Sequence, residues 1–299
     1  MKSKIVFVIL HYCAIQSTID SVESIRKYPS TEIVIVDNAS PDKSGLELVD
    51  KYKDIPNIYI ILNRTNEGFA RGNNIGYHYS RDILHADFIV IINNDVLMIQ
   101  PNFTQLLQSI YLNSRFDILG PDIITPEGHH RNPHRYKTFS KQDLNRIIRN
   151  RTIILLYLHL KRILGITTKI HFLENWDSKR SERERNNIDR NHIQYNIVLQ
   201  GSCLIFSPDF IKKESDAFYP ETFMWMEEEI LTFLCQQKGY TICYNPKIKV
   251  LHKEEVNTQN TLPQYSRYYF FSQQLRNSAS IMKKLIIQYE KKDSLSNDN

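Results

Sequence analysis

The first third of the chain alternates short apolar runs with segments whose apolar residues recur every three to four positions. Four runs have the length and composition of buried strands, and they lie at residues 5–10, 32–36, 58–62 and 88–92. Segments with a helical pattern lie between them, near 16–27, 43–53 and 71–83. Strands that are apolar on both faces and alternate with helices are typical of a parallel sheet covered by helices. The pattern therefore predicts an α/β fold with a mostly parallel central sheet.

The second half of the chain has a different pattern. Residues 125–195 are rich in His, Arg, Asn and Lys and contain an apolar insert at 151–166. Further strand-like runs follow at 203–206, 240–244 and 248–251. A helical pattern at 225–238 separates the first two of these runs, and a basic, helical tail extends over 264–292. A chain of 299 residues suits one large α/β domain or two fused smaller ones.

Composition narrows the choice of partners. The chain is 41% hydrophobic and 24% charged, which is ordinary for a globular protein, and its formal net charge is +5. This mild basic excess favours anionic partners such as phosphates or an acidic membrane surface. The basic residues are dispersed and form no known nucleic-acid-binding module, so we expect no nucleic acid partner.

The expected compartment follows from the N-terminal sequence and the cysteines. No signal-peptide pattern is visible, and no stretch reaches the roughly 18 uninterrupted apolar residues that span a bilayer. The four cysteines are widely spaced and form no C-x-x-C pair. We therefore expect a reducing, cytoplasmic environment with free thiols.

Polar side chains follow each of the four predicted strands. Ligands of such sheets bind at the carboxyl ends of the strands. The residues expected there are His11 and Tyr12, Asp37 and Asn38, Asn63 and Arg64, and Asn93, Asn94 and Asp95. Loops are commonly polar, but four polar strand ends with two carboxylates favour a binding site.

The stretch IVIVDNASPD at 33–42 ends the second predicted strand with Asp37. A carboxylate at this position can accept hydrogen bonds from the N–H edge of a uracil or thymine ring. The same residues could equally form a loop that caps the following helix. This stretch alone leaves both interpretations open.

The stretch NEGFARGNNIG at 66–76 is glycine-rich and leads into a helix that we expect to begin near Ala70. Gly68 would permit close backbone approach, and the helix start would offer N–H groups to a phosphate. Arg71 would add positive charge, whereas Asn73 and Asn74 would add hydrogen bonds. Glycine-rich turns are usually only turns, so the spacing alone is a weak signal.

Two further residues have the chemistry of metal ligands. Asp95 follows a fully apolar strand in NND, and a carboxylate of this kind suits Mg²⁺ or Mn²⁺. The alternative is a solvated turn. His252 ends the run KIKVLH and could complete a metal shell or contact a diphosphate, although a single histidine after a strand is more often structural.

Three adjacent glutamates, Glu227, Glu228 and Glu229, lie within the aromatic and apolar stretch FMWMEEEIL. A run of charges is usually a solvated helix face. Carboxylates packed together in apolar surroundings have raised pKa values, and one of them could act as a general base toward a hydroxyl.

In this order, the motifs resemble those of the inverting glycosyltransferases of family 2, which have the GT-A fold. The matching stretches are HYC at 11–13, VDNASPD at 36–42, NEGFARGNNIG at 66–76, NND at 93–95, FMWMEEEIL at 223–231 and VLH at 250–252. The resemblance spans about residues 4–255 and depends on the joint order of these motifs. Residues 129–195 and the tail carry no signature of the family.

The resemblance implies a role for each position. Asp37 would bind the nucleobase in a pocket lined by Tyr12, and Asp95 and His252 would hold the metal on the donor diphosphate. Glu228 would be the catalytic base because it aligns with the Asp of the family's E-D motif, with Glu227 as the alternative. Asn93 replaces the first Asp of D-x-D, which puts two-carboxylate metal binding in doubt. The predicted donor-binding residues are Tyr12, Asp37, Asn38, Gly68, Arg71, Asn73, Asn74 and Asn94.

The resemblance also divides the chain into a nucleotide-sugar-binding half (1–97), an acceptor-binding and catalytic half (98–260) with an insertion at about 125–195, and a C-terminal helical tail (261–299). The implied function is metal-dependent transfer, with inversion, from a UDP- or dTDP-type sugar. The acceptor would be a glycan or lipid-linked saccharide of bacterial surface polysaccharides. Rival functions are a sugar-nucleotide nucleotidyltransferase, whose Gly-rich loop after the first strand is missing from HYCAIQS, and a non-catalytic glycan-binding or scaffold protein.

The stretch 146–166, RIIRNRTIILLYLHLKRILGI, mixes basic and apolar residues. It could be a core helix with solvated ends. It could also be an interfacial helix on an anionic membrane, which suits an enzyme acting at the inner face of the cell membrane on lipid-linked acceptors. The oligomeric state cannot be inferred from these patterns.

Overall fold

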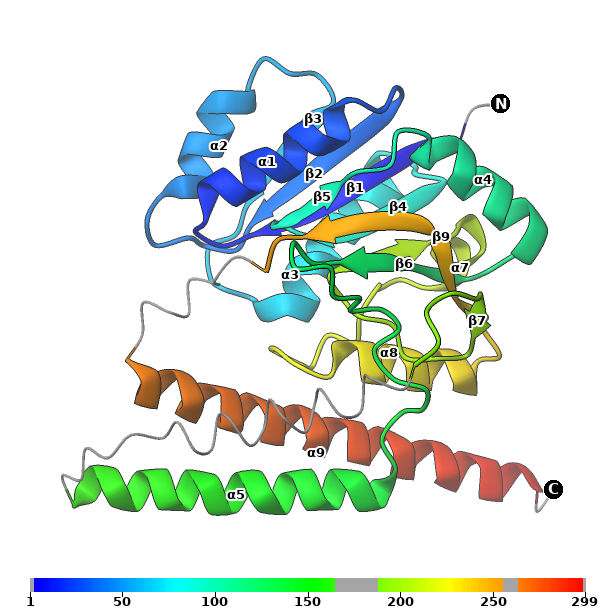
Figure 1. Cartoon of the computed structure of the whole chain (residues 1–299). Coiled ribbons are helices and arrows are strands. Elements are labelled where there is room, and N and C mark those ends of the chain that lie inside the picture. The colour runs from blue at the N-terminus through cyan, green and yellow to red at the C-terminus, as the bar shows by residue number, and fades with distance from the viewer. Residues whose placement is uncertain (1–2, 165–187, 255–262, 298–299) are drawn as a thin grey trace.

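The computed structural model describes residues 3–164, 188–254 and 263–297, and the strands within them form one sheet (Figure 1). In chain order these strands are β1 (Ile5–His11), β2 (Thr31–Asp37), β3 (Ile58–Leu62), β4 (Phe88–Asn93), β5 (Val96–Met98), β6 (Ile118–Ile124), β7 (Gln194–Tyr195), β8 (Cys203–Phe206) and β9 (Ile242–His252). The four strands predicted in the first third are β1 to β4.

Helices cover both faces of this sheet (Figure 1). The helices of the described residues are α1 (Ile15–Arg26), α2 (Ser44–Tyr52), α3 (Gly68–His78) with its π-helical continuation η1 (Tyr79–Ile83), α4 (Phe103–Ser114), α5 (Lys141–Ile163), α7 (Pro208–Lys213), α8 (Glu227–Gln237) and α9 (Gln264–Asn297). Of these, α5 and α9 lie outside the two layers that cover the sheet.

The sheet is mostly parallel, as predicted. Its order is β3-β2-β1-β4-β8-β6-β9-β5, with β7 paired to β9. Strands β1, β2, β3 and β4 are parallel, and so are β6 and β9, whereas β8 runs antiparallel between β4 and β6. Strands from both predicted halves of the chain therefore belong to one sheet, and the functional division between the halves stays a prediction.

Two apolar layers hold the helices to the sheet, and alternation along β1 shows how. Ile5, Phe7 and Ile9 belong to the layer under α1, α2 and α4, while Val6 and Val8 belong to the layer under α3, α7 and α8. All five side chains are at most 1% exposed. Burying each such side chain stabilises the fold by roughly 1.5–3 kcal/mol, which explains why the strand is apolar on both faces.

The structure adds elements that the pattern did not predict. β5, α4 and β6 lie within residues 96–124, where no element was expected. The two runs at 240–244 and 248–251 form one strand, β9, whose register against β6 shifts between Pro121 and Asp122. Pro246 lies within the displaced part of β9, and because proline cannot donate to the ladder, it is usually found at such irregular positions.

The segment 151–166 lies mainly in α5, which packs along α9 on the side away from the sheet (Figure 1). Leu144 of α5, Ile230 of α8 and Met282 of α9 belong to one buried apolar cluster that joins the three helices. The tail therefore packs against the main body through α8. Residues 165–187 of the predicted insertion lie outside the described residues.

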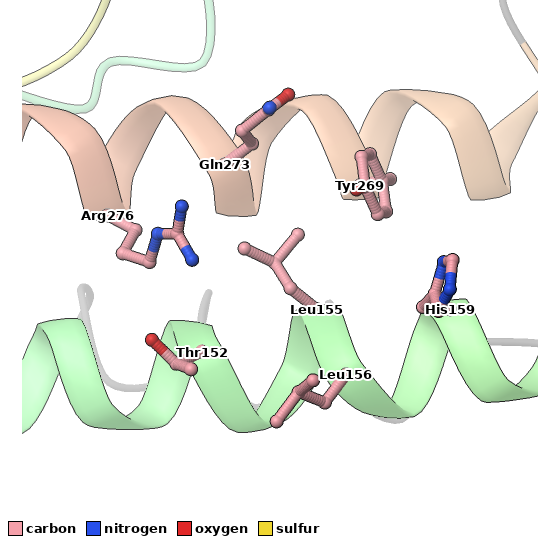
Figure 2. A pocket seen from close by; sticks show the side chains of 7 residues that line it. All are labelled: Thr152, Leu155, Leu156, His159, Tyr269, Gln273 and Arg276. Carbon is pink, nitrogen blue, oxygen red and sulfur yellow. The ribbon is translucent and has the colours of Figure 1, made fainter.

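A small pocket of about 200 Å³ lies between α5 and α9 (Figure 2). Its lining residues are Thr152, Leu155, Leu156 and His159 of α5 and Tyr269, Gln273 and Arg276 of α9. In the described part of the chain, no helix combines the length and the apolar character needed to cross a membrane.

Candidate active site

The carboxyl ends of three parallel strands meet around β1. His11 at the end of β1 is paired in register with Asp37 of β2, and Leu10 is paired with Asn93 of β4. Because β1 lies between β2 and β4, the loop after Asp37 and the loop containing Asp95 lie on either side of the same strand end. The structure thus brings together the strand ends that sequence analysis singled out.

The first of these carboxylates, Asp37, is 6% exposed. Its Oδ1 accepts a hydrogen bond from the Ser40 hydroxyl at 2.5 Å. The loop after Asp37 does cap the following helix in part, although not through the N-cap residue Lys43, whose side chain makes no capping hydrogen bond. Asp42 instead accepts from the backbone N–H of Ser44 at 3.0 Å. The nucleobase role of Asp37 stays a prediction.

The chain turns back directly after β1, leaving Tyr12 37% exposed at the strand end. The turn is made by Cys13 and Ala14, whose φ angles are 56° and 39°. The Cys13 N–H donates to the Ser40 hydroxyl at 2.8 Å, so the Tyr12 turn is tied to the Asp37 loop.

Asn38 is buried and makes four side-chain hydrogen bonds. Its amide nitrogen donates to Asn66 Oδ1 at 3.0 Å and to the Gly68 carbonyl at 3.1 Å. Its Oδ1 accepts from the Glu67 N–H at 2.9 Å and from Asn63 Nδ2 at 3.1 Å. This uses the full capacity of an asparagine side chain. Asn38 therefore fixes the glycine loop, and the donor contact predicted for its side chain would require one of these bonds to break.

The glycine loop packs against the acidic motif. Gly68 has a φ of +76°, and a Cβ there would lie 2.3 Å from the Phe223 carbonyl oxygen. The Phe69 N–H donates to that same oxygen at 2.7 Å, and the Gly68 N–H donates to Asn66 Oδ1 at 2.9 Å. The helix α3 therefore begins earlier than the expected start near Ala70, and the N–H groups of Gly68 and Phe69 are engaged within the protein. Phosphate binding at this helix start stays a prediction.

Three polar residues of α3 make side-chain hydrogen bonds, and two of them contact the segment that leads to the acidic motif. Asn74 donates to the Phe218 carbonyl at 2.7 Å and accepts from its N–H at 2.9 Å. Arg71 Nε donates to the Pro220 carbonyl at 2.8 Å. Asn73 Nδ2 donates to the Phe69 carbonyl at 3.0 Å, while its Oδ1 is buried without a hydrogen-bond partner. Of these predicted donor-binding residues, Asn73 alone has a buried polar atom that the protein leaves unsatisfied.

Asp95 and His252 lie together. Pairing of β5 with β9 sets Val96 opposite His252, and the Lys253 N–H donates to the Asp95 carbonyl at 3.0 Å. The His252 Nε2 lies 3.1 Å from Asp95 Oδ1. The two side chains are 11% and 8% exposed. The structure therefore brings together two predicted metal ligands that are far apart in the sequence.

This donor pair suits a divalent cation that is shared with a substrate. Mg²⁺ and Mn²⁺ bind one or two carboxylates together with substrate phosphates and water, and Mn²⁺ also accepts imidazole. Within the described residues, no group of three or more His, Cys, Asp or Glu side chains could hold a metal. Asp95 and His252 thus fit an ion whose remaining ligands come from a diphosphate and from water.

The three adjacent glutamates have different surroundings at the start of α8. Glu227 is 3% exposed and its Oε1 has no hydrogen-bond partner, and burial together with the Glu228 charge raises its pKa to about 8. Glu229 is 4% exposed and pairs with Arg135, whose Nε lies 3.2 Å from Oε1. Glu228 is the one that remains partly exposed. As a residue, Glu228 is therefore more accessible than Glu227 and Glu229, although its carboxyl group is itself desolvated.

Gly201 holds the Glu228 carboxylate. The Gly201 N–H donates to Glu228 Oε1 at 3.0 Å, and burial raises the pKa of this carboxyl. The Ser202 carbonyl accepts from the Asn93 N–H at 2.9 Å. The loop at 201–202 therefore joins the predicted base to the strand that leads to Asp95. Sequence analysis missed Gly201, because an isolated glycine before a strand carries no distinguishing pattern.

The segment before α8 has a strained backbone that α9 supports. Trp225 and Met226 have φ angles of 70° and 69°, which is costly for residues with side chains. The Trp225 and Phe271 rings pack edge to face with centroids 4.9 Å apart. Ser278 Oγ donates to the Met224 carbonyl at 3.1 Å. Sequence analysis also missed this contribution of α9, although the aromatic run YYFF at 268–271 is a visible signal.

Relatives of known function match parts of the chain. The hexosyltransferase Agl10 of low-salt glycan biosynthesis in Haloferax volcanii is 33% identical over 97 residues, which cover 32% of this chain and 30% of the relative. The dTDP-rhamnosyl transferase RfbF of Shigella flexneri is 29% identical over 133 residues, 44% of this chain and 43% of that protein. The matches thus span less than half of either relative.

Solved structures share the fold. S. aureus TarS 1–349 in complex with UDP has a TM-score of 0.52 at 14% identity, over 92% of this chain and 65% of that one. GalNAc-T7 with UDP, GalNAc and Mn²⁺ has a TM-score of 0.55 at 13% identity, over 85% of this chain and 44% of that one. Both are GT-A glycosyltransferases, and this likeness shows that the present chain has the GT-A fold.

All the motifs described above except VLH at 250–252 fall within a single family match. The sequence profile of Glycosyl transferase family 2 matches residues 5–231, from β1 into α8. This match covers most of the chain and includes the strand ends, the glycine loop and the glutamates. The chain belongs to glycosyltransferase family 2.

Proposed function

We propose that this protein transfers a hexosyl or rhamnosyl group from a UDP- or dTDP-type sugar to a saccharide acceptor, with inversion at the anomeric carbon and dependence on a divalent cation. The observation that carries the proposal is the Asp95–His252 contact at 3.1 Å. Asp95 follows β4 and Asp37 ends β2, so one strand, β1, separates them at the end of the sheet where the parallel strands finish. Family membership favours glycosyl transfer over nucleotidyl transfer and over a scaffold role.

The donor would lie along this edge, with its base near Asp37 and its diphosphate near Asp95. UDP is present in the TarS and GalNAc-T7 structures, and RfbF is named for a dTDP-linked sugar. Both nucleotides are pyrimidines whose N–H edge suits a carboxylate acceptor. These likenesses support a pyrimidine donor and leave the sugar open.

Asp95 and His252 would hold Mg²⁺ or Mn²⁺. The bound ion would neutralise the charge that develops on the departing diphosphate. The GalNAc-T7 structure contains Mn²⁺, which supports this choice of ion. The chain itself contributes the orientation of both ligands through the pairing of β5 with β9.

Glu228 would act as the base. As the acceptor oxygen forms a bond to the anomeric carbon, the bond to the diphosphate oxygen breaks and the diphosphate departs with its electron pair. The acceptor hydroxyl proton moves to the Glu228 carboxylate. Attack opposite the leaving group in a single displacement gives inversion. The Gly201 N–H holds one carboxylate oxygen, and the raised pKa makes the carboxylate a stronger base.

We further propose that the acceptor is lipid-linked and that α5 lies on an anionic membrane at the cytoplasmic face. One stripe of α5 is apolar and 46–67% exposed, and it consists of Ile153, Leu156, Tyr157, Leu160 and Ile163. The spacing sets these side chains on one side of the helix, apart from the side packed on α9. Four basic residues of the helix are exposed, Lys141, Arg146, Arg149 and Arg162, against one Asp, which is complementary to anionic lipid. The pocket with His159 and Arg276 lies beside the stripe (Figure 2).

A donor screen tests the transfer. UDP- and dTDP-hexoses and dTDP-rhamnose would be incubated with Mn²⁺ and lipid-linked or short saccharide acceptors, and the anomeric configuration of the product would be read by NMR. We expect one donor to give a product of inverted configuration. Retention, or the absence of transfer and of donor hydrolysis with every donor, would overturn the proposal.

Vesicle flotation tests the membrane face. The wild-type protein should float with vesicles containing anionic lipid at low salt, and Leu156→Glu with Leu160→Glu should abolish flotation. Both side chains are exposed, so the double variant should fold normally. Wild-type protein that stays unbound, or that forms a dimer which the same variant disrupts, would assign this face to another role.

A further inference from the structure

His11 is buried and takes no part in the mechanism above, yet both of its ring nitrogens are engaged. Nδ1 lies 2.7 Å from Thr18 Oγ1, and Nε2 lies 2.8 Å from Ser44 Oγ. The side chain is fully buried at the end of β1. A buried imidazole with two hydroxyl partners connects the structures on either side of the strand end.

Each hydroxyl continues the connection. Ser44 Oγ donates to Asp42 Oδ1 at 2.6 Å, which ties His11 to the loop after Asp37. Asn94 Nδ2 donates to Thr18 Oγ1 at 3.3 Å, which ties His11 to the residue before Asp95. One chain of hydrogen bonds thus extends from the metal loop, below the strand end, to the nucleobase loop.

The direction of donation along this chain is fixed by counting protons. The single Ser44 hydroxyl proton goes to Asp42, so Ser44 Oγ accepts from His11 Nε2–H. A neutral imidazole that donates through Nε2 must accept through Nδ1, so the Thr18 hydroxyl donates to Nδ1 at 2.7 Å in preference to the Ala14 carbonyl at 3.4 Å. Burial lowers the pKa of His11 against the raising influence of Asp37 and Asp42, which agrees with a neutral ring. Each hydrogen bond is then donated in the same direction, from Asn94 through Thr18, His11 and Ser44 to Asp42.

We propose that His11 is a positioning residue for the nucleotide-sugar donor, holding the Asn94–Asp95 loop and the Asp37–Asp42 loop at the spacing that one nucleoside diphosphate requires. This rests on the function proposed above, in which the base contacts one loop and the diphosphate the other. The ring is rigid and touches both hydroxyls, so it couples loops that no other described hydrogen bond from this strand end connects.

Two substitutions at position 11 test the two hydrogen bonds of the imidazole separately, because each keeps one bond and removes the other. An asparagine at position 11 places its amide near Nδ1 and keeps the Thr18 contact, whereas a glutamine reaches the position of Nε2 and keeps the Ser44 contact. His11→Gln and Thr18→Val should therefore weaken binding of Mn²⁺ in the presence of UDP or dTDP. His11→Asn and Ser44→Ala should weaken binding of the nucleoside monophosphate without metal. Each loss should be about tenfold, as for one buried hydrogen bond.

The experiment measures both affinities by calorimetry for the wild type and the four variants, with thermal midpoints alongside. A second measurement uses ¹⁵N-histidine NMR, in which His11 should appear as the neutral Nε2–H tautomer. Equal losses of both affinities in all four variants, in proportion to the fall in midpoint, would reduce His11 to a structural residue. An Nδ1–H tautomer would contradict the direction of donation and overturn the proposal.

The outcomes also separate this proposal from the one on which it rests. Wild-type protein that binds neither nucleotide nor Mn²⁺ overturns the transferase function and the positioning role with it. Normal wild-type binding with four unaffected variants overturns the positioning role alone.

Discussion

The Gly201 N–H donates to Glu228 Oε1 at 3.0 Å, at a point where a Cβ on residue 201 would lie 2.2 Å from that oxygen. The glycine therefore sets the position of the carboxylate, since any larger residue displaces it. A shift of this kind is large enough to misalign a general base.

Gly201→Ala should lower kcat about tenfold or more while changing the KM for the donor little, because the carboxylate is displaced but the nucleotide loops are untouched. Gly239→Ala is the matched control. A Cβ at Gly239 meets nothing within 4 Å, although the φ of +69° makes the substitution strained. It should lower stability without lowering kcat, and an equal loss of kcat in both variants would contradict the assignment.

Glu228→Gln tests the base directly. Glutamine keeps the Gly201 contact but cannot take a proton, so kcat should fall about 10²–10⁴-fold. In the wild type the pKa of Glu228 is raised, and only its ionised form accepts a proton. The rate should therefore rise with pH, and this rise should lie at a pH above 4.5, the ordinary pKa of glutamate. Near-normal transfer by Glu228→Gln at saturating substrates would show that the base lies elsewhere.

Glu227 gives a prediction about stability. Its pKa in the folded protein is about 8, against 4.5 as the ordinary value, so the fold favours the protonated form. The stabilisation that the protonated Glu227 carboxyl gives the fold is fully present below pH 4.5. It is lost as pH rises through 8, and the free energy of unfolding falls by up to about 1.4 kcal/mol per pH unit. Glu227→Gln should remove this slope and be more stable than the wild type at pH 8 in urea unfolding. Parallel pH profiles for the two proteins would show that Glu227 is not the cause.

The metal ligands can be tested without turnover. Mn²⁺ together with UDP or dTDP should raise the thermal midpoint of the wild type, because ligands that bind only the folded state stabilise it. Asp95→Asn should abolish this shift, and His252→Asn should reduce it. His192→Asn, at an exposed position paired with Asp189, is the control and should leave it unchanged. A full shift in Asp95→Asn would remove Asp95 from the metal site.

Sequence alone predicted the parts of this fold that depend on local patterns. β1 to β4 are apolar on both faces and end in polar residues. The apolar pattern predicts the strands and their parallel direction. The position of Asp37 and Asp95 after two of these strands predicts that the two carboxylates lie at the same end of the sheet. The motif order pointed to the family for the same reason, since each motif lies at a strand end or a helix start. These features require no knowledge of distant contacts.

Features created by distant contacts were not predicted. The engagement of Asn38 depends on four partners in the loop at 63–68, and the role of Gly201 depends on a glutamate that only the fold brings to it. β6 was missed because Gly120 and Pro121 interrupt its apolar run. The length of α5 is visible in the sequence, but which of its two apolar sides packs on α9 is decided by tertiary structure.

The contact between Trp225 and Phe271 leads to a final prediction, which concerns a helix beyond the family match. Residues 5–231 match the family, whereas α9 begins at Gln264. The left-handed backbone at Trp225 and Met226 costs energy that neighbouring packing must offset.

Phe271→Ala removes the edge-to-face partner of Trp225, so the segment should relax and α8 should lose its fixed start. We expect kcat to fall several-fold with little change in UDP affinity, because the lost contact lies just before α8, next to the proposed base. Tyr289→Ala, which removes a ring packed on Phe233 in the middle of α8, should lower stability but keep kcat. If both variants lose kcat in proportion to stability, α9 stabilises the fold as a whole and does not specifically position the segment before α8.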